Sequence, residues 1–291
     1  MLRCVLAVCA VAAVYGQTDN LVQLATKIGA TDLVKVVTQA GLADTLANKG
    51  PFTVFAPSNE AFARVPKRII EELERNKTLL TDLLLYHVTN GKVLSTQLKN
   101  GQLAPSLFEK HDLRFNIYNE GKLITAEGSP VALADQQASN GVIHLLNKVI
   151  FPIPEGSVVD FVSRDPFVST LLKAVVAANL VKTLEGGPFT VFAPTNEAFN
   201  RLPPGALDKL LANVTALAEV LTYHVVKGTV YAEGLTNGER VATVEGQDLS
   251  VRKMGPERVI INNAMVERAD ISVTNGVIHV INNVLIPPPK K

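Results

Sequence analysis

A long segment of this chain occurs twice. Gly50-Pro-Phe-Thr-Val-Phe-Ala-Pro-Ser-Asn-Glu-Ala-Phe62 returns as Gly187-Pro-Phe-Thr-Val-Phe-Ala-Pro-Thr-Asn-Glu-Ala-Phe199, with one Ser/Thr exchange. Two shorter motifs recur in the same order: Tyr86-His-Val88 as Tyr223-His-Val225, and Asn140-Gly-Val-Ile-His144 as Asn275-Gly-Val-Ile-His279. Motifs that keep their order in both copies predict two homologous domains. The repeat is longer than the units of solenoid proteins, so we expect each copy to have its own hydrophobic core.

The first residues of the chain have the pattern of a secretory signal. Residues 1–16 contain a basic start, an apolar run from Val5 to Val14 and the small residue Gly16, followed by polar residues. No other stretch approaches the ~20 apolar residues of a membrane-spanning helix. The basic tail 289–291 lacks the hydrophobic end of a lipid-anchor signal. We therefore expect a secreted, soluble protein without a membrane anchor.

Cysteine usage and charge exclude several classes of protein. Cys4 and Cys9 both lie in the expected signal, so the rest of the chain has no thiol for a disulfide, a nucleophile or a metal site. Stability must come from burial, which a hydrophobic content of 47% makes feasible for two domains. The formal net charge is only +1 and tryptophan is absent, so neither a basic surface nor stacking platforms for nucleic acid are expected.

The sequence contains none of the local motifs that carry enzyme chemistry. There is no Gly-x-Ser-x-Gly elbow, no His-Glu-x-x-His, no glycine-rich phosphate loop and no clustered pair of histidines. We therefore expect no enzyme activity, no cofactor and no metal site. A hydrolytic site that only the fold assembles remains an alternative, because catalytic triads need not be local in sequence.

Each copy begins with helical periodicity and continues with short strands. In the first copy, apolar residues recur at helical spacing from Leu21 to Ala40, and Phe52 to Ala56 is a β-rich run that Pro57 ends. After Gly91 the pattern predicts these strands: Leu113–Tyr118, Leu123–Thr125, Val131–Ala134, Val142–Leu145 and Val149–Phe151. Helices followed by strands predict an α+β fold with an antiparallel sheet.

The boundaries follow from the repeat and from a proline-containing junction. We assign residues 17–152 to the first domain, 153–154 to a linker and 155–288 to the second domain. Pro152 and Pro154 stiffen the junction, so we expect a restricted orientation of the two domains.

The repeated motifs together resemble the fasciclin-1 (FAS1) domain family. The Thr-Val-Phe-Ala-Pro-(Ser/Thr)-Asn-Glu-Ala-Phe segments are similar to its first signature, the Tyr-His pairs to its central motif and Asn-Gly-Val-Ile-His to its second signature. The resemblance covers roughly residues 19–152 and 155–288. It implies an α+β domain with a β-sandwich or wedge of mostly antiparallel strands and flanking N-terminal helices. It also implies a role in extracellular adhesion and matrix organisation, often through integrins.

The resemblance implies an integrin contact at an Asp-Ile pair just before the second signature. Asp270-Ile271 matches this pair, whereas Asp135 of the first copy is followed by Gln136. An exposed carboxylate can complete the oxygen shell of a divalent cation held by a receptor. Arg268-Ala-Asp270 is also similar to an Arg-Gly-Asp adhesion tripeptide, with Ala in place of the flexible Gly. The alternative is an Asp that caps a turn ahead of a strand, with Ile271 in the core.

The family also names the Tyr-His pair as an adhesion element. In this chain, His87 and His224 continue the apolar face of a helix that carries Tyr86 or Tyr223. That spacing favours buried, hydrogen-bonded histidines with a structural role.

Two glycosylation sequons occupy matching positions. Asn76-Lys-Thr78 and Asn213-Val-Thr215 each stand at the start of the helix that bears the Tyr-His pair. A matched pair in a chain with an expected secretory signal favours N-glycosylation. The alternative is that Ser or Thr there only caps the helix.

The leading hypothesis is a secreted adhesion or matrix protein that presents two FAS1-like domains to integrins or other receptors and to matrix proteins. Its alternative is a soluble extracellular carrier of a polysaccharide or an apolar small molecule, held in a pocket between sheet and helices. A cryptic hydrolase is the third candidate.

Overall fold

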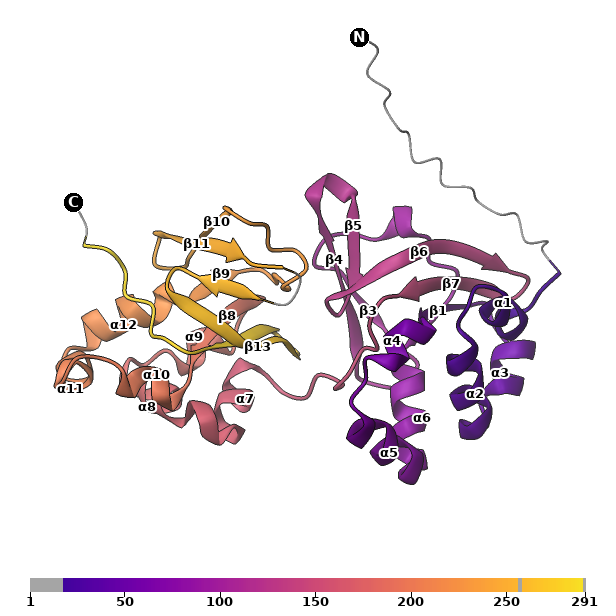
Figure 1. Cartoon of the computed structure of the whole chain (residues 1–291), viewed down its shortest axis with the longest axis horizontal. Helices are drawn as coiled ribbons and strands as arrows, with labels where there is room; N and C mark the ends of the chain where they lie inside the picture. The colour runs from indigo at the N-terminus through magenta and orange to yellow at the C-terminus, as the bar shows by residue number, and fades with distance from the viewer. Residues whose placement is uncertain (1–17, 256–257, 290–291) are drawn as a thin grey trace, which may run out of the picture.

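The computed structural model describes residues 18–255 and 258–289, which form two domains lying side by side (Figure 1). The expected signal, residues 1–16, lies outside the described residues, as do the last two residues of the expected basic tail. In Figure 1 the strands of the two domains face each other near the centre, and the helices lie at the lower and outer sides.

The first domain begins with helices and ends with strands, as the sequence predicts. Its elements are α1 (Leu21–Lys27), α2 (Thr31–Ala40), α3 (Ala43–Asn48), β1 (Phe52–Pro57), α4 (Asn59–Ala63), α5 (Lys67–Arg75), α6 (Lys77–Tyr86), β2 (Val88–Asn90), the 3-10 turn η1 (Ser95–Gln97), β3 (Leu103–Pro105), β4 (Asp112–Tyr118), η2 (Asn119–Gly121), β5 (Leu123–Ala126), β6 (Ser129–Ala138) and β7 (Gly141–Leu146). Side chains cap several helices: Ser58 Oγ accepts the Ala61 amide at the start of α4.

The second domain repeats this order. Its elements are α7 (Val158–Arg164), η3 (Pro166–Val168), α8 (Ser169–Ala177), α9 (Val181–Leu184), β8 (Phe189–Pro194), α10 (Asn196–Asn200), α11 (Ala206–Leu211), α12 (Val214–Tyr223), β9 (Val225–Lys227), β10 (Arg240–Ala242), β11 (Asp248–Lys253), β12 (Val259–Ile261), β13 (Ala264–Val273) and β14 (Gly276–Ile281).

Each domain has one seven-stranded sheet, with the order β2-β1-β7-β6-β5-β4-β3 in the first and the equivalent order in the second. The strands of both sheets are mostly antiparallel, as the family resemblance implies. A wholly antiparallel sheet is ruled out by one pair in each domain, because β1 runs parallel to β7 and β8 parallel to β14. Glycine permits the first step of this pairing: a Cβ on Gly141 would collide with the Phe52 carbonyl oxygen. The repeated Asn-Gly motif therefore marks where the first strand and the last strand come together.

The predicted strand Val149–Phe151 is also wrong. These residues belong to no strand, and the Ile150 amide donates to Nε2 of His87 (3.2 Å) instead of a sheet carbonyl. The β-rich composition reflects burial of Ile150, which is 4% exposed, and not a ladder.

Each domain has its own buried apolar clusters, as the repeat length predicts. One cluster lies between the helices and the β1–β7 part of the sheet, and a second lies among the remaining strands around Phe55 and Phe115 in the first domain. The second domain has the same two clusters, the latter around Phe192 and Leu249. Each of the four clusters draws its residues from one domain and its adjoining linker.

The two domains interlock through two tyrosines, each lying against a glycine of the other domain. A Cβ on Gly128, in the β5–β6 turn, would overlap the Tyr231 ring, and a Cβ on Gly234 would overlap the Tyr118 ring. The Tyr231 amide donates to the Tyr118 hydroxyl (3.0 Å), and the Tyr231 hydroxyl donates to Glu127 Oε2 (2.9 Å). The linker alone therefore does not set the orientation of the domains.

The interlocking residues differ between the copies. Matching bonds from Tyr86 to the Asp112 carbonyl and from Tyr223 to the Asp248 carbonyl align β4 with β11. In this alignment Met254 stands where the first domain has Tyr118. The contact joins two different surfaces, and the far side of the second domain lacks the tyrosine needed to repeat it.

We predict that Gly128→Ala loosens the contact between the domains. The added methyl group meets the Tyr231 ring, so we expect the free energy of unfolding to fall by roughly 1–3 kcal/mol beyond the effect of backbone strain. Gly121→Ala is the matched control, since Gly121 also has positive φ but no atom within 4 Å of an added Cβ. Urea unfolding and small-angle scattering of both variants provide the measurement. Equal stabilities and equal radii of gyration for the two variants would contradict the interlock.

Candidate functional site

The candidate receptor-contact residues lie on an irregular stretch in the long strand before the last motif. The register of β13 against β14 shifts between Arg268 and Ile271, and β6 shifts against β7 between Leu133 and Gln136. Asp270 and Asp135 occupy these bulges with positive φ values of 60° and 58°. The bulge turns each Asp away from the regular alternation of the strand.

A buried histidine holds each bulge in place. The Asp135 amide donates to His144 Nδ1 (3.2 Å), and His144 Nε2 donates to the Val93 carbonyl (2.8 Å). The second domain repeats this pattern, with the Asp270 amide on His279 Nδ1 (3.3 Å). Because one nitrogen accepts and the other donates, each ring is neutral with its proton on Nε2. Burial lowers the pKa of His144 and favours the same state.

The two Asp side chains have the same capping role. Asp270 Oδ1 accepts the Ala232 amide (2.7 Å), and Asp135 Oδ1 accepts the Ser95 amide (2.7 Å) at the start of η1. Asp135 Oδ2 also accepts the Ser95 hydroxyl. In the second domain the equivalent of Ser95 is Ala232, so Asp270 Oδ2 has no such partner.

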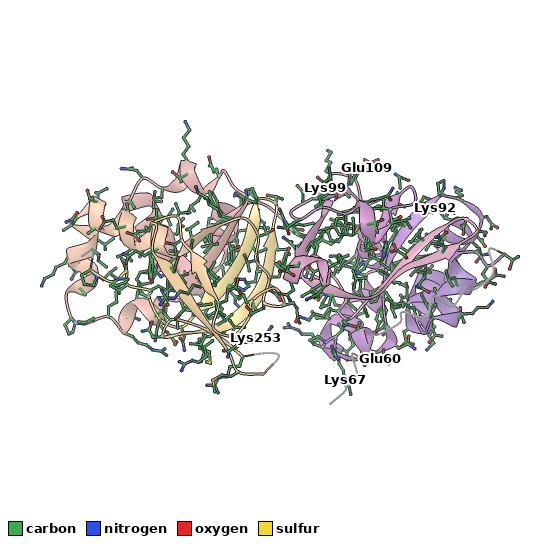
Figure 2. The ribbon with its side chains drawn as sticks, turned by 90° about the horizontal axis from the view of Figure 1, so that it is seen from above. Glu60, Lys67, Lys92, Lys99, Glu109 and Lys253 are labelled. Atoms are coloured by element: carbon green, nitrogen blue, oxygen red, sulfur yellow. The ribbon has the colours of Figure 1, made fainter. Side chains whose placement is uncertain are left out.

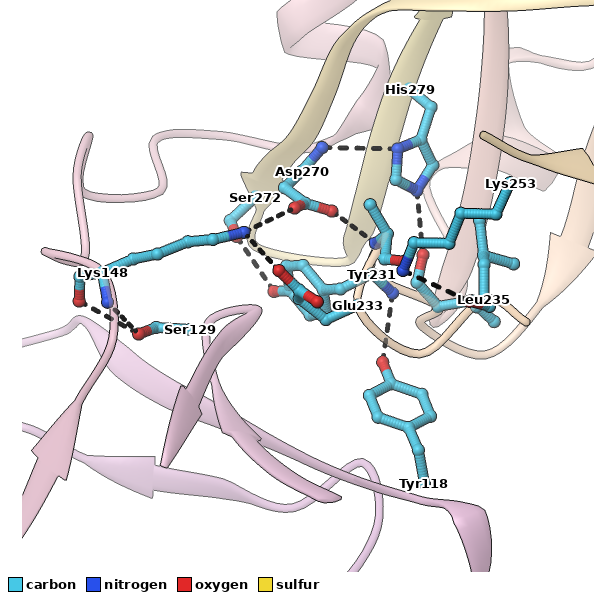
Figure 3. Close-up of polar contacts among 12 residues, drawn as sticks. Tyr118, Ser129, Lys148, Tyr231, Glu233, Leu235, Lys253, Asp270, Ser272 and His279 are labelled. Carbon is cyan, nitrogen blue, oxygen red and sulfur yellow. Dashed lines mark hydrogen bonds and ion pairs between the residues drawn. The ribbon is translucent and has the colours of Figure 1, made fainter. Parts of the chain in front are cut away.

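Asp270 lies beside the domain junction (Figure 3). Lys148 of the first domain reaches across, with its Nζ 2.9 Å from Glu233 Oε1 and 4.0 Å from Asp270 Oδ2. The Asp270 side chain keeps 21% of its surface exposed and that of Asp135 34%. Both carboxylates are therefore partly accessible, but neither projects freely from the surface.

The neighbours of Asp270 have structural contacts of their own. Ile271 is half-buried against the core of the second domain. Arg268 forms an ion pair with Asp165 and lies over the Phe161 ring, 5.8 Å from its centre. In this geometry Arg268 belongs to the α7 side of its domain and does not form a tripeptide loop with Asp270.

Ser95, Asp135 and His144 lie close together but lack the arrangement of a catalytic triad. The Ser95 hydroxyl donates to Asp135, while the two polar atoms of the His144 ring are bonded to the Asp135 amide and the Val93 carbonyl. Both ring nitrogens of His144 are bonded to backbone groups, so neither is placed to take a proton from Ser95 as a general base does.

The Tyr-His pairs are buried in both domains. His87 and His224 are each 2% exposed, and Tyr86 and Tyr223 at most 1%. His87 Nδ1 donates to the Leu83 carbonyl (2.8 Å), one helical turn back along α6. These side chains connect helix ends to the chain after the last strand and have no surface to offer a receptor.

Both sequon asparagines are exposed N-caps. Asn76 Oδ1 accepts the Leu79 amide (3.0 Å) at the start of α6, and Asn213 Oδ1 accepts the Ala216 amide (3.1 Å) at the start of α12. The alternative in which Ser or Thr caps these helices is wrong, because the cap is the asparagine. Because the cap uses Oδ1 and both residues are exposed, the amide nitrogen to which a glycan would be attached is not needed for the cap.

The pockets bear on the carrier alternative. An apolar pocket beneath α5 and α6, with Phe62 and Leu84 in its wall, has a volume of about 50 Å³. Ligand sites usually have roughly 300–1,000 Å³. A wider groove of about 510 Å³ lies beside it, but Arg64, Lys148 and Glu233 line it together with apolar side chains.

Among residues 18–255 and 258–289, no helix has the length and hydropathy to span a bilayer. Within the same ranges, no three His, Cys, Asp or Glu side chains gather into a candidate metal site.

Comparisons with known proteins identify the fold. A model described as the Fasciclin domain matches residues 29–152 and 166–287. The chain belongs to the fasciclin domain family. It is 35% identical to the transforming growth factor-beta-induced protein ig-h3 of Sus scrofa, over 83% of this chain and 35% of that protein. It is 33% identical to periostin of Homo sapiens, over 91% of this chain and 32% of that protein.

The chain thus spans about a third of the length of these two relatives. A solved FAS1 domain pair from the insect cell adhesion molecule fasciclin I aligns with a TM-score of 0.44 and 22% identity, over 90% of this chain and 98% of that one. The family match confirms the predicted α+β class with two tandem fasciclin domains.

Sequence reasoning missed the residues that surround Asp270 at the junction. Lys148, Glu233 and Tyr231 come from segments that the repeated motifs do not include. Differences between the copies were the available signal, since Leu94 occupies the position equivalent to Tyr231.

We predict that acid destabilises both fasciclin domains through their helix-end histidines. Burial lowers the pKa of His87 and of His224 from 6.5 to about 4. The unfolded chain therefore binds more protons between these values, and stability falls as the pH drops from about 6.5 towards 4. We expect the free energy of unfolding to fall by about 2 kcal/mol per histidine between pH 7.5 and pH 5. Urea unfolding at several pH values in this range measures how steeply the free energy of unfolding changes with pH.

His87→Gln provides the control for this pH dependence. The variant should start from lower stability, because Gln does not reproduce both hydrogen bonds, but its first domain should lose the steep part of the slope. An unchanged slope in the variant would show that other groups cause the acid sensitivity.

Proposed function

We propose that this chain is a secreted adhesion or extracellular-matrix protein that presents two fasciclin domains to cell-surface receptors. The observation that carries the proposal is the match of both halves of the chain to the Fasciclin domain, together with the adhesion role implied by the motifs. The partners we propose are an integrin or another cell-surface receptor and matrix proteins.

We further propose that the receptor contact is the corner formed by Asp270 and Ile271. One oxygen of Asp270 caps the Ala232 amide, and the other lies 4.0 Å from the Lys148 ammonium. A divalent cation held by a receptor would take the place of the Lys148 ammonium at that oxygen. In the first domain both oxygens of Asp135 already accept hydrogen bonds from Ser95. The second domain is therefore the better candidate. This reason adds to the sequence difference, in which the first copy has Gln136 where the second has Ile271.

We predict that Asp270→Asn reduces cell attachment to the purified protein at least tenfold. The substitution removes the carboxylate charge needed for a cation shell while it keeps an oxygen for the Ala232 amide. Alanine would also remove this cap, so a loss of attachment would then have two causes. Asp135→Asn is the matched control at the same position of the first domain.

Attachment should also disappear when divalent cations are chelated, and circular dichroism should report the same fold for both variants. Attachment that persists in Asp270→Asn, or that falls equally in Asp135→Asn, would reject the Asp270 site. Attachment that is absent from the wild-type protein would reject the integrin proposal as a whole.

The carrier of a polysaccharide or an apolar small molecule is the weaker alternative. The apolar pocket of the first domain is too small for a drug-sized ligand, and the wider groove has charged walls. The cryptic hydrolase has the least support, because the nearby Ser95 and His144 are not bonded to each other.

We propose that Asn76 and Asn213 carry N-linked glycans when the chain passes through a secretory pathway. We predict two glycan additions by mass spectrometry, of which Thr78→Val and Thr215→Val each remove one. Both variants keep the asparagine caps, so thermal stability measured after enzymatic deglycosylation should match the wild type. A wild-type mass without either addition would contradict the proposal.

A further inference from the structure

A groove lies beside the domain junction, on the α4–α5 side of the first domain. Its volume of about 510 Å³ falls within the range of roughly 300–1,000 Å³ that is usual for small-molecule sites. Most of its lining comes from α4, α5 and the chain after β7, and Glu233 of the second domain contributes the remaining side chain. In Figure 2, Glu60 of α4 and Lys67 of α5 lie at one edge of the first domain, and Lys253 of the second domain lies along the same edge.

The walls of this groove are mostly apolar. The apolar residues in its lining are Ala61, Val65, Pro66, Ile69, Val149 and Phe151. Phe151 keeps 36% of its surface exposed, and Val149 beside it is half-buried. The small apolar pocket beneath α5 and α6 shares four of these residues, which are Val65, Ile69, Val149 and Phe151. An apolar chain in the groove would therefore lie against side chains that already belong to an apolar wall.

Arg64 lines the groove and has a free guanidinium. Its side chain is exposed and forms no hydrogen bond or ion pair with any described residue. The equivalent residue of the second copy has partners, because Arg201 Nη1 donates to the Asn282 carbonyl (3.0 Å) and Nη2 lies 4.0 Å from Glu197. Glu60 stands at the position of Glu197 but is not paired with Arg64. The Arg64 guanidinium is thus available to a ligand.

The other two charges in the lining compensate each other. Lys148 Nζ lies 2.9 Å from Glu233 Oε1 across the junction (Figure 3). Asp270, 4.0 Å from the same ammonium, does not line the groove. Because the Lys148–Glu233 pair is neutral as a whole, Arg64 gives the lining one uncompensated positive charge. Such a lining matches a ligand that has a single negative charge and an apolar body.

We propose that this groove binds a carboxylate with an apolar chain, such as a medium-chain fatty acid. The carboxylate accepts hydrogen bonds from the Arg64 guanidinium, whose fork of donors matches its two oxygens. The chain lies along Val149 and Phe151 and removes their apolar surface from water. Charged walls that disfavour a wholly apolar ligand thus favour one with a negative head group. This binding activity goes beyond the proposed adhesion function and is independent of the Asp270 corner.

Octanoate is the probe that tests this proposal. It is titrated into the two-domain protein, and nuclear magnetic resonance follows the methyl groups of Val65, Ile69 and Val149. Octanol has the same chain without the charge, and acetate has the charge without the chain. We expect octanoate to shift these methyl signals with a dissociation constant of about 1 mM. Octanol should bind at least fivefold more weakly, and acetate should cause no saturable shift.

Two variants separate the head group from the chain. Arg64→Gln should weaken octanoate binding at least fivefold and leave octanol binding unchanged, because it removes an exposed charge without a partner among the described residues. Phe151→Ala should weaken the binding of both ligands. Arg201→Gln is the matched control at the equivalent position of the second domain, and octanoate should bind to it as to the wild type. Circular dichroism checks that each variant is folded.

Several outcomes would overturn the proposal. Equal affinity of octanoate for Arg64→Gln and for the wild type, or equal affinities of octanoate and octanol, would show that Arg64 does not recognise the head group. Acetate binding as tight as octanoate binding would show that the apolar walls contribute nothing. Shifts confined to methyl groups outside the groove, or the absence of saturable octanoate binding, would reject the groove as the site.

Discussion

Each domain depends on a buried histidine at the end of one helix. His87 donates to the Leu83 carbonyl and accepts the Ile150 amide, and His224 does the same with the Val220 carbonyl and the Leu285 amide. The ring thus joins the helix to the chain that follows the last strand, where no sheet partner is available for that amide. Leaving a buried amide unpaired costs about 1–3 kcal/mol. The neutral ring accepts this amide in place of the carbonyl of a neighbouring strand. A second histidine in each domain holds the bulge that carries Asp135 or Asp270 in the same way. These cross-connections matter in a chain whose described part contains no cysteine.

The two domains share these histidine contacts, but the contact between the domains uses side chains that differ between them. Tyr118, Arg114 and Glu127 on one side, and Tyr231 on the other, have no equivalent in the opposite copy. Burial raises the pKa of Tyr231 and keeps its phenol protonated, so that it donates to the Glu127 carboxylate. The result is a junction with polar bonds at its centre and a tyrosine against a glycine on either side. Such a contact favours one orientation, because a change of angle would separate the tyrosine rings from the glycines that accommodate them.

The same junction also bears on the proposed function. At the Asp270 corner, Lys148 of the first domain faces the carboxylate that is proposed to meet a receptor, so the first domain contributes to that surface and is more than a spacer. Asp135 lies in the equivalent bulge but has both oxygens satisfied by Ser95. Two residues with the same backbone geometry thus differ in what they can bind, and the difference comes from their neighbours.

The sequence alone determined the family, the duplication, the helix-then-strand order and the buried state of the Tyr-His pairs, because these follow from local patterns and repeated motifs. The sequence did not predict the parallel pairing of β1 with β7, and it wrongly predicted a strand at residues 149–151. In these places the partner of a backbone amide is a distant strand or a histidine ring. It also identified Asp270 and Asp135 and offered a turn cap as one interpretation of Asp270, but it did not reveal that the capped amides are those of Ala232 and Ser95. Only the tertiary structure decided which carboxylate oxygens remain free and which cations lie beside them. Those properties depend on groups that come together from both domains, so the spacing of residues along one segment does not predict them.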